Sequence, residues 1–385
     1  MKYFFSAGEH SGDLHAAALI REVRRLDPAA EIWGMGGPLM AEAGAEIVID
    51  PTRESTFGYL EAAKKYFVFK KYFKQLTRLL KERRPDVMVW VDFGGFNVLL
   101  AEQAAALSIP VVCLFPPSAW AYSKGRAARV AGCVTHIASV LPFEADFYRE
   151  YGLKVTYVGH PLIDRVKPAV EPERWRQSYY VKAEEKVILL MPGSRRQEVQ
   201  QLLPVMLEAI AQIAAGEEKL RFFLPVAPTI GRELIGSYLA AYPGLVSLVD
   251  SADAYNVMAA ADLGILASGT ATLEAALLGL PMVVVYRLSG VSAFLFKILM
   301  NEEKKKEPLM VALPNLIKRR RVIPELIQHD LTPENLVAQF RLLLETEGLR
   351  AEIRKELSEL SALLGPPGVM ERVATIVVGE ASQKR

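Results

Sequence analysis

The 385-residue sequence contains only two cysteines, Cys113 and Cys133. Two thiols cannot build a disulfide framework or a four-ligand zinc site, so we expect a protein of the reducing cytoplasm. The sequence contains no run of about 18 apolar residues, so no membrane-spanning helix is expected. The apolar stretch after Met1 turns polar too early for a signal peptide core.

The sequence also lacks an excess of charge. Its 46 Lys and Arg residues against 44 Asp and Glu give a net charge of +2, which argues against nucleic acid as a partner. The phosphate-binding pattern G-x-x-x-x-G-K-[ST] is absent, which argues against a P-loop ATPase. His10 and His15 lie five residues apart and miss the spacing of one helical face, so no metal site is expected.

Short apolar runs alternate with longer helical patterns along the chain. Because these runs are continuously apolar, they predict strands buried on both faces of parallel sheets, with helices between them. The expected strands are residues 2–7, 31–36, 86–92, 110–115, 135–140, 155–160, 186–193, 220–226, 245–250, 262–268 and 281–287.

A stretch rich in proline and charge, residues 160–186, interrupts this alternation. We therefore expect an α/β protein with two Rossmann-like domains, residues 1–165 and 166–385. From about residue 324 onward the pattern predicts helices with little strand.

Ligands of open parallel sheets bind beyond the carboxyl ends of strands. After the first expected strand, two glycines permit a tight turn, and Ser11 or Asp13 can cap the helix that follows. Glu9, His10 and Asp13 are expected where a substrate lies, and Glu9 is a catalytic candidate. The pattern is not G-x-G-x-x-G, so a dinucleotide site is weakly supported. The alternative is ordinary turn and cap chemistry.

Asp92 ends the strongly apolar strand of residues 86–92. Burying a carboxylate there without compensation is costly, so packing explains it poorly. A general base for a sugar hydroxyl is the functional interpretation. The alternative is a structural aspartate bonded to loop amides.

The segment "ILLMPGSRRQEV", residues 188–199, turns from a strand into a helix. Gly193 and Ser194 present backbone N–H groups at a helix start, where the dipole favours an anion. Arg195 can add a bidentate phosphate contact. The alternative is a surface pair of Arg195 and Arg196 with no ligand.

A second helix start, at Ser268, Gly269 and Thr270, predicts a second anion cradle. Glu274 follows one turn later on an otherwise apolar helix. Its carboxylate suits a grip on the two ribose hydroxyls of a nucleotide. The alternative is an exposed helix residue.

Residues 56–76 combine aromatic side chains in one sector of a helical wheel with lysines in the opposite sector. Such a helix can lie on an anionic membrane, or it can be a core-facing helix with a basic solvent face. A second candidate for a lipid-facing surface is residues 286–306. These segments suggest a substrate with an apolar part.

The sequence resembles the lipid-A-disaccharide synthase family from about Tyr3 to Gln328. Eight motifs occur in the order of that family, which makes the resemblance specific. They are "AGEHSGD", "GMGGPLM", "PSAWAY", "LPFEADFY", "VGHPLID", "PGSRRQEV", "ASGTATLEAALLGLPMVVVYR" and "LPNLI".

The resemblance implies a GT-B glycosyltransferase whose two Rossmann-like domains face each other across a cleft. The family joins UDP-2,3-diacylglucosamine to 2,3-diacylglucosamine 1-phosphate by a β-1,6 linkage with inversion, and needs no metal or other cofactor. It also implies a cytoplasmic enzyme peripherally bound to the inner membrane, and a homodimer formed through the C-terminal region.

The resemblance assigns the base to Asp92 and stabilisation of the departing diphosphate to Arg195. The residues it assigns to UDP are Gly193, Ser194, Arg195, Ser268, Gly269, Thr270, Glu274 and Asn315. One departure concerns the family pattern D-x-P-D-F-N, which here is "DFGGFN", so Gly95 replaces the second aspartate. The approach to "LPNL" is also longer and more basic than usual.

Two alternatives to this function stay open. The first is another UDP-N-acetylglucosamine enzyme of the same fold, such as the peptidoglycan N-acetylglucosaminyltransferase or a 2-epimerase. The second is a non-catalytic membrane-associated binding protein.

Overall fold

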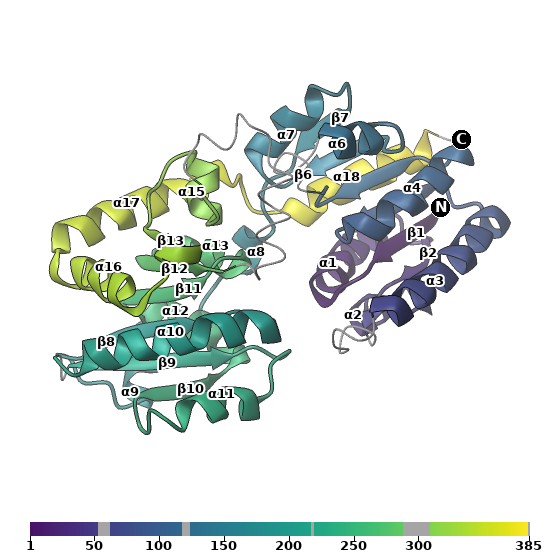
Figure 1. The fold of residues 1–385 in the computed structure, drawn as a ribbon. Coiled ribbons are helices and arrows are strands. Elements are labelled where there is room, and N and C mark those ends of the chain that lie inside the picture. The colour runs from purple at the N-terminus through teal and green to yellow at the C-terminus, as the bar shows by residue number, and fades with distance from the viewer. Residues whose placement is uncertain (53–61, 118–123, 217–218, 288–308, 384–385) are drawn as a thin grey trace. The chain divides into compact units, whose positions relative to one another are not determined.

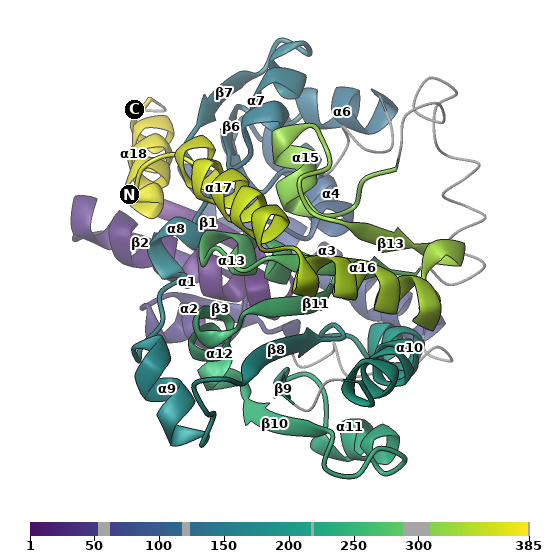
Figure 2. The same ribbon diagram turned by 90° about the vertical axis from the view of Figure 1, so that its left-hand side faces the viewer.

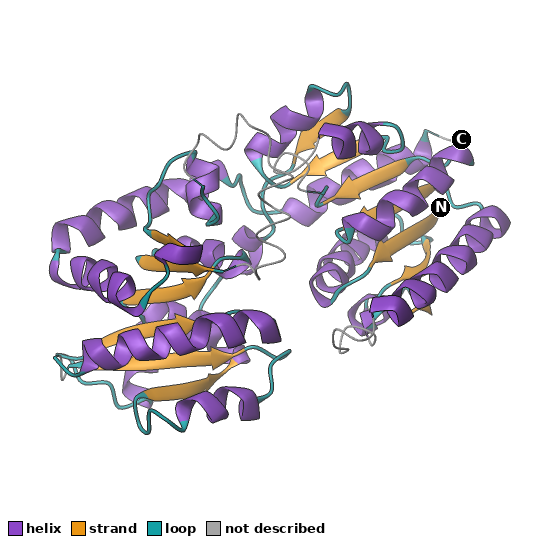
Figure 3. Cartoon of the chain, viewed as in Figure 1, coloured by secondary structure: helices purple, strands orange, loops and turns teal. Residues whose placement is uncertain are grey.

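The computed structural model describes residues 1–385 except 53–61, 118–123, 217–218, 288–308 and 384–385, and it does not describe the side chains of residues 62–65 and 124. The chain forms two compact units, one of Met1–Pro161 with Leu364–Arg385 and one of Leu162–Leu363. Each unit is a parallel sheet with helices on its faces (Figures 1 and 3). This confirms the expected α/β class.

The first unit contains a seven-stranded sheet of order β3-β2-β1-β4-β5-β6-β7. Its strands are β1 (Lys2–Ala7), β2 (Glu31–Met35), β3 (Glu46–Ile49), β4 (Val87–Val91), β5 (Val111–Leu114), β6 (His136–Ser139) and β7 (Lys154–Tyr157). Its helices are α1 (His10–Leu26), α2 (Pro38–Glu42), α3 (Ala62–Arg83), α4 (Gly94–Ala106), α6 (Lys124–Ala131), α7 (Pro142–Arg149) and α18 (Val369–Ser382).

The second unit contains a six-stranded sheet of order β10-β9-β8-β11-β12-β13. Its strands are β8 (Lys186–Met191), β9 (Leu220–Val226), β10 (Val246–Asp250), β11 (Leu263–Ala267), β12 (Met282–Tyr286) and β13 (Glu325–Ile327). Its α-helices are α8 (Leu162–Arg165), α9 (Pro172–Ser178), α10 (Arg196–Ala214), α11 (Arg232–Leu239), α12 (Ala254–Ala260), α13 (Thr270–Leu277), α15 (Leu313–Lys318), α16 (Pro333–Glu345) and α17 (Glu347–Leu363). Figure 2 shows α15 and α17 side by side, and both contact α13.

All the strands expected from the sequence are present, and two further strands were missed. β3 and β13 are short edge strands, of four and three residues. In β3 three apolar residues lie between Glu46 and Asp50, and in β13 two lie between Glu325 and Gln328, so neither stands out as a continuous apolar run. The expectation of little strand after residue 324 overlooked β13.

Helix α18 departs from the expected domain boundaries, because residues 364–385 belong to the first unit and not to the second. Its apolar face, with Val369, Val373 and Val377, is fully buried, and the helix contacts α1. Figure 1 shows α18 in yellow among the purple and blue elements of the first unit. The sequence could not reveal this return, because an amphipathic pattern does not say which sheet it covers.

The described part of helix α3 divides its two faces as an amphipathic helix does. Phe69, Tyr72 and Phe73 pack against the core of the first unit, and Leu76 is fully buried. The lysines at 70, 71 and 74 are exposed. This portion is therefore a core-facing helix with a basic solvent face, the alternative expected above.

The start of α3 differs, because Tyr66 and Phe67 are 63% and 67% exposed. Residues 56–61 of the predicted membrane helix, and 288–306 of the second lipid candidate, lie outside the described residues. Within the described residues, no helix combines the length and apolar character needed to cross a bilayer.

Candidate active site

The second unit changes its winding direction between β8 and β11. Strands β9 and β10 follow on one side of β8, and β12 and β13 follow on the far side of β11. The two strands run parallel, with Leu190 opposite Ile265 and Met191 opposite Leu266. The loops that follow them therefore leave the sheet side by side at its carboxyl edge, which is where open α/β sheets bind ligands. The two predicted anion cradles occupy these loops.

The first cradle begins at Gly193, whose φ of 110° is open to glycine and strained for other residues. Arg195 is the N-cap residue of α10, and its side chain is 75% exposed. The N–H groups of Ser194 and Arg195 point at a carboxylate of the chain itself, Oε2 of Glu198, at 3.2 and 3.3 Å. Glu198 Oε1 also accepts a 2.9 Å hydrogen bond from Nη1 of Arg195. The predicted donors thus converge on one point, and an anion already lies there.

The second cradle consists of Gly269 and Thr270, both exposed at the start of α13. A Cβ added to Gly269 would meet no described atom within 4 Å, so the backbone itself is accessible at this point. Ser268 contributes less than expected, because its hydroxyl donates to the backbone oxygen of Val311 at 2.8 Å. The first turn of α13 carries no acidic residue, so its positive dipole end favours an anion.

Glu274 is half-buried on α13, not an exposed helix residue. Its Oε1 accepts a 2.8 Å hydrogen bond from the hydroxyl of Tyr255. Burial raises the pKa of Glu274 above its ordinary value, whereas the Tyr255 hydrogen bond and the charge of Arg165 pull that pKa down. A carboxylate held in this way can accept hydrogen bonds from a diol.

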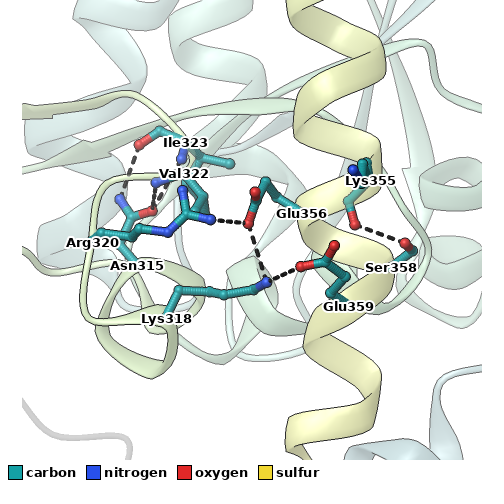
Figure 4. Close-up of polar contacts among 9 residues, drawn as sticks. All are labelled: Asn315, Lys318, Arg320, Val322, Ile323, Lys355, Glu356, Ser358 and Glu359. Carbon is teal, nitrogen blue, oxygen red and sulfur yellow. Dashed lines mark hydrogen bonds and ion pairs between the residues drawn. The ribbon is translucent and has the colours of Figure 1, made fainter.

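Asn315 does not present its side chain to a ligand. It is fully buried, and its Oδ1 accepts from the N–H groups of Val322 and Ile323 at 2.8 and 3.0 Å. Its Nδ2 donates to the Ile323 backbone oxygen at 2.9 Å. Figure 4 shows these contacts beside the ion pairs that join α15 to α17. The side chain of Asn315 therefore stabilises the 319–323 loop. A direct contact between this side chain and a nucleotide stays a prediction.

The first unit changes its winding direction in the same way, between β1 and β4. Ala7 lies opposite Val91 in the parallel pair, so the residues after these strands reach the same edge. Glu9 and Asp92 are these residues, and both are exposed. The structure thus brings the two predicted catalytic carboxylates to one switch point.

The backbone at Asp92 is unusual. Asp92 and Phe93 have φ values of 54° and 55°, two consecutive non-glycine residues in the left-handed region. Such strain clusters at functional sites and persists only where neighbours enforce it. The Asp92 backbone oxygen accepts from Trp90 Nε1 at 2.6 Å and from Asn97 Nδ2 at 2.8 Å. These bonds fix the turn from which the Asp92 carboxylate projects.

The Asp92 side chain partly matches its structural alternative. Its Oδ1 accepts a 2.7 Å hydrogen bond from the N–H of Phe93, yet the residue is exposed. Gly95 nearby is also exposed, and a Cβ there would meet nothing within 4 Å. Space for the family's second aspartate therefore exists, and its absence has no steric cause.

Asn97, which the sequence analysis did not single out, holds the turn that carries the candidate base. It is fully buried, accepts from the Ser6 hydroxyl at 2.5 Å and donates to the Ser6 backbone oxygen at 3.0 Å. It therefore ties the end of β1 to the turn at Asp92. The available signal was an asparagine at the start of an apolar helix, next to the expected base.

Asp13 is structural, and His160 is buried. The fully buried Asp13 carboxylate accepts from the N–H groups of Gly37, Leu39 and Met40, so it caps α2 rather than its own helix or a substrate. Burial lowers the pKa of His160 to about 4. Within the described residues, no three His, Cys, Asp or Glu side chains are grouped to hold a metal ion.

Two Rossmann-like units, each a parallel sheet with a switch point at its carboxyl edge, are the architecture of the GT-B fold. Solved structures of this fold resemble the chain along its whole length. UDP-GlcNAc 2-epimerase from Neisseria meningitidis bound to UDP-GlcNAc matches with a TM-score of 0.67 and 14% identity, covering 100% of both chains. MurG from Acinetobacter baumannii matches with a TM-score of 0.60 and 16% identity, covering 98% of this chain and 99% of MurG.

The sequence comparisons identify one family within this fold. The family model described as lipid-A-disaccharide synthetase matches residues 3–375. Lipid-A-disaccharide synthases from Anaeromyxobacter dehalogenans and Geobacter sulfurreducens are 39% and 36% identical, over 97% of this chain and 96% and 95% of theirs. The chain belongs to the lipid-A-disaccharide synthase family.

Proposed function

We propose that the chain transfers a diacylglucosaminyl group from UDP-2,3-diacylglucosamine to O6 of 2,3-diacylglucosamine 1-phosphate. The products are a β-1,6-linked disaccharide 1-phosphate and UDP. Membership of the lipid-A-disaccharide synthase family carries this proposal. The paired helix starts at the β8–β11 switch point, with Glu274 beside them, support the donor half.

The proposed donor site divides into two parts. The N–H groups at Ser194 and Arg195, the Arg195 guanidinium and the start of α13 bind the diphosphate. Glu274 binds the ribose hydroxyls. Because these groups supply the positive charge that the departing UDP requires, the proposal assigns no metal to the reaction.

The proposed chemistry is a direct displacement with inversion. The acceptor O6 attacks the anomeric carbon while the bond from that carbon to the UDP oxygen breaks. Asp92 takes the O6 proton as general base. Glu9, which follows the neighbouring strand, is the second catalytic candidate and is assigned to orienting the acceptor.

A peripheral location on the cytoplasmic face of the inner membrane is the third part of the proposal. Exposed Tyr66 and Phe67, with the exposed lysines at 70, 71 and 74, give α3 an aromatic tip beside a basic face. That combination suits an anionic bilayer surface, from which acylated substrates would be taken. A homodimer through the C-terminal region stays a prediction from the resemblance.

The runner-up function is another UDP-N-acetylglucosamine enzyme of the same fold. The solved neighbours support it only as a likeness of fold, because their identity to this chain is 11–16%. The family match, at 36–39% identity over nearly the whole chain, favours the lipid substrates.

The test is a single incubation analysed by mass spectrometry. Purified protein is mixed with UDP-2,3-diacylglucosamine and 2,3-diacylglucosamine 1-phosphate, and UDP and a disaccharide 1-phosphate are expected. A parallel incubation with UDP-N-acetylglucosamine alone tests the epimerase. Absence of disaccharide, or epimerisation of the second substrate, would contradict the proposal.

A further inference from the structure

The carboxylate of Glu198 lies where the proposed function places the donor's diphosphate. Its Oε2 accepts from the N–H groups of Ser194 at 3.2 Å and Arg195 at 3.3 Å. Its Oε1 accepts from Nη1 of Arg195 at 2.9 Å. These three donors are the ones that the proposed function assigns to the phosphates, so the protein's own anion occupies its anion site.

Gly193 makes this arrangement sterically possible. A Cβ at this position would lie 2.5 Å from Oε2 of Glu198 and 2.8 Å from its Cβ, far closer than van der Waals contact. A side chain at 193 would therefore push the carboxylate out of the cradle. The glycine serves the contact with Glu198 as well as the turn itself.

We infer that Glu198 is an internal competitor of the donor diphosphate. It fills the cradle when no nucleotide is present, moves out when the diphosphate binds, and returns as UDP leaves. The inference rests on the proposed function, because that function supplies the diphosphate.

The physical reason is that two anions cannot share the same three donors. Binding of the nucleotide then exchanges one set of charge-assisted hydrogen bonds for another, and the net gain is smaller than the new contacts alone would give. UDP is held less tightly as a result. Weaker binding of UDP favours its release, a step that limits turnover in many enzymes.

The test separates charge from shape. Glu198→Gln keeps the size of the side chain and an acceptor oxygen but removes the negative charge. Glu208→Gln is the matched control, because it removes the same charge from an exposed position on the same helix. Affinities for UDP and for uridine are measured by titration calorimetry.

We expect Glu198→Gln to bind UDP about tenfold more tightly than the unaltered protein, equivalent to about 1.4 kcal/mol. Glu208→Gln should not change UDP affinity. Uridine lacks the diphosphate, so its affinity should not respond to Glu198→Gln. In turnover assays, Glu198→Gln should show stronger product inhibition by UDP.

Equal or weaker UDP binding by a folded Glu198→Gln variant would overturn the inference. If that variant does not fold, a crystal structure of the unaltered protein with UDP decides, and Glu198 still bonded to both amides beside bound UDP would overturn it. If neither the unaltered protein nor the variant binds UDP, the proposed function itself fails. UDP binding by the unaltered protein without a gain in the variant refutes only the role of Glu198.

Discussion

The hydroxyl of Tyr255 donates a 2.8 Å hydrogen bond to Oε1 of Glu274, one helix away. Burial raises the pKa of Glu274, and this hydrogen bond opposes the rise. Tyr255 therefore favours the ionised form of the carboxylate and orients it at the proposed ribose site. Burial, and after it the charge and hydrogen bond of Glu274, raise the pKa of Tyr255, which keeps its phenol protonated as a donor.

Tyr255→Phe should weaken UDP binding by about 5- to 30-fold. This range corresponds to the loss of one hydrogen bond that contributes roughly 1–2 kcal/mol. Removing the donor raises the pKa of Glu274 further, and ribose recognition requires the ionised form. The loss of binding at acidic pH should therefore begin at a higher pH in the variant. Calorimetric titrations of UDP across pH 5–8 measure both effects, and overlapping pH profiles would contradict the role of Tyr255.

Arg195→Ala should reduce UDP affinity by roughly 10- to 150-fold, since a hydrogen bond to a charged group contributes about 1.5–3 kcal/mol. Turnover should fall with it. The free energy of unfolding should change little, because the ion pair with Glu198 involves a largely exposed arginine. Calorimetry and thermal unfolding measure the two quantities, and undiminished UDP affinity would remove Arg195 from the site.

Asp92→Asn should leave UDP binding intact and lower transfer by about 10²–10⁴-fold, the usual contribution of a general base. Asparagine still accepts a hydrogen bond, so the turn at Phe93 should persist. Product formation is followed by mass spectrometry beside a UDP titration. Transfer at the normal rate would exclude Asp92 as the base.

His160 should make the first unit sensitive to acid. Its folded pKa of about 4 lies below the ordinary value of 6.5, so unfolding takes up a proton as the pH falls. The stability that depends on neutral His160 is complete above pH 6.5 and is lost as the pH falls to about 4, by roughly 3 kcal/mol. His160→Gln should flatten the dependence of the unfolding free energy on pH in this window.

The matched control for this experiment is His329→Gln, because the side chain of His329 is 90% exposed. Burial also lowers the pKa of His136, which retains part of the acid sensitivity in both variants. Denaturant titrations at several pH values between 4 and 7.5 give the free energy of unfolding and its slope against pH. If the free energy of unfolding of His160→Gln depends on pH as steeply as that of the unaltered protein, burial does not lower the pKa of His160.

Replacing Lys70, Lys71 and Lys74 by glutamine should weaken binding to anionic vesicles, by about 1 kcal/mol for each lysine near the surface. Lys64 belongs to the same predicted basic face and is replaced with them. The effect should be largest at low salt, because screening removes it. Vesicle sedimentation at two salt concentrations measures it, and equal binding before and after substitution would assign α3 to the core alone.

Most of the sheet architecture followed from the sequence, because strands buried on both faces leave continuous apolar runs. The strands β3 and β13 escaped, since they hold only three and two consecutive apolar residues between polar ones. The positions of Glu9, Asp92, Arg195 and Thr270 at strand ends were also predictable, because parallel strands bring their carboxyl ends to one edge.

Side-chain partnerships were not predictable in the same way. Asp13 caps a helix 24 residues further on, and Asn97 bonds to Ser6 across 91 positions. Such contacts depend on which strands become neighbours, and the sequence pattern does not specify that. The contact of Glu198 with the first cradle is local by contrast, because its hydrogen-bond donors lie only three and four residues before it.

The return of α18 to the first unit has a topological consequence. The chain leaves that unit after Pro161 and re-enters it at Leu364, where the His160 N–H donates to the Leu364 oxygen at 2.8 Å. Residues 162–363 are therefore an insertion in the first unit. The two segments of that unit are in contact at the residues that flank the insertion. Replacing residues 162–363 by a short peptide would keep every strand and helix of the first unit, whereas deleting the C-terminal tail would remove α18 from that unit and leave the second unit whole.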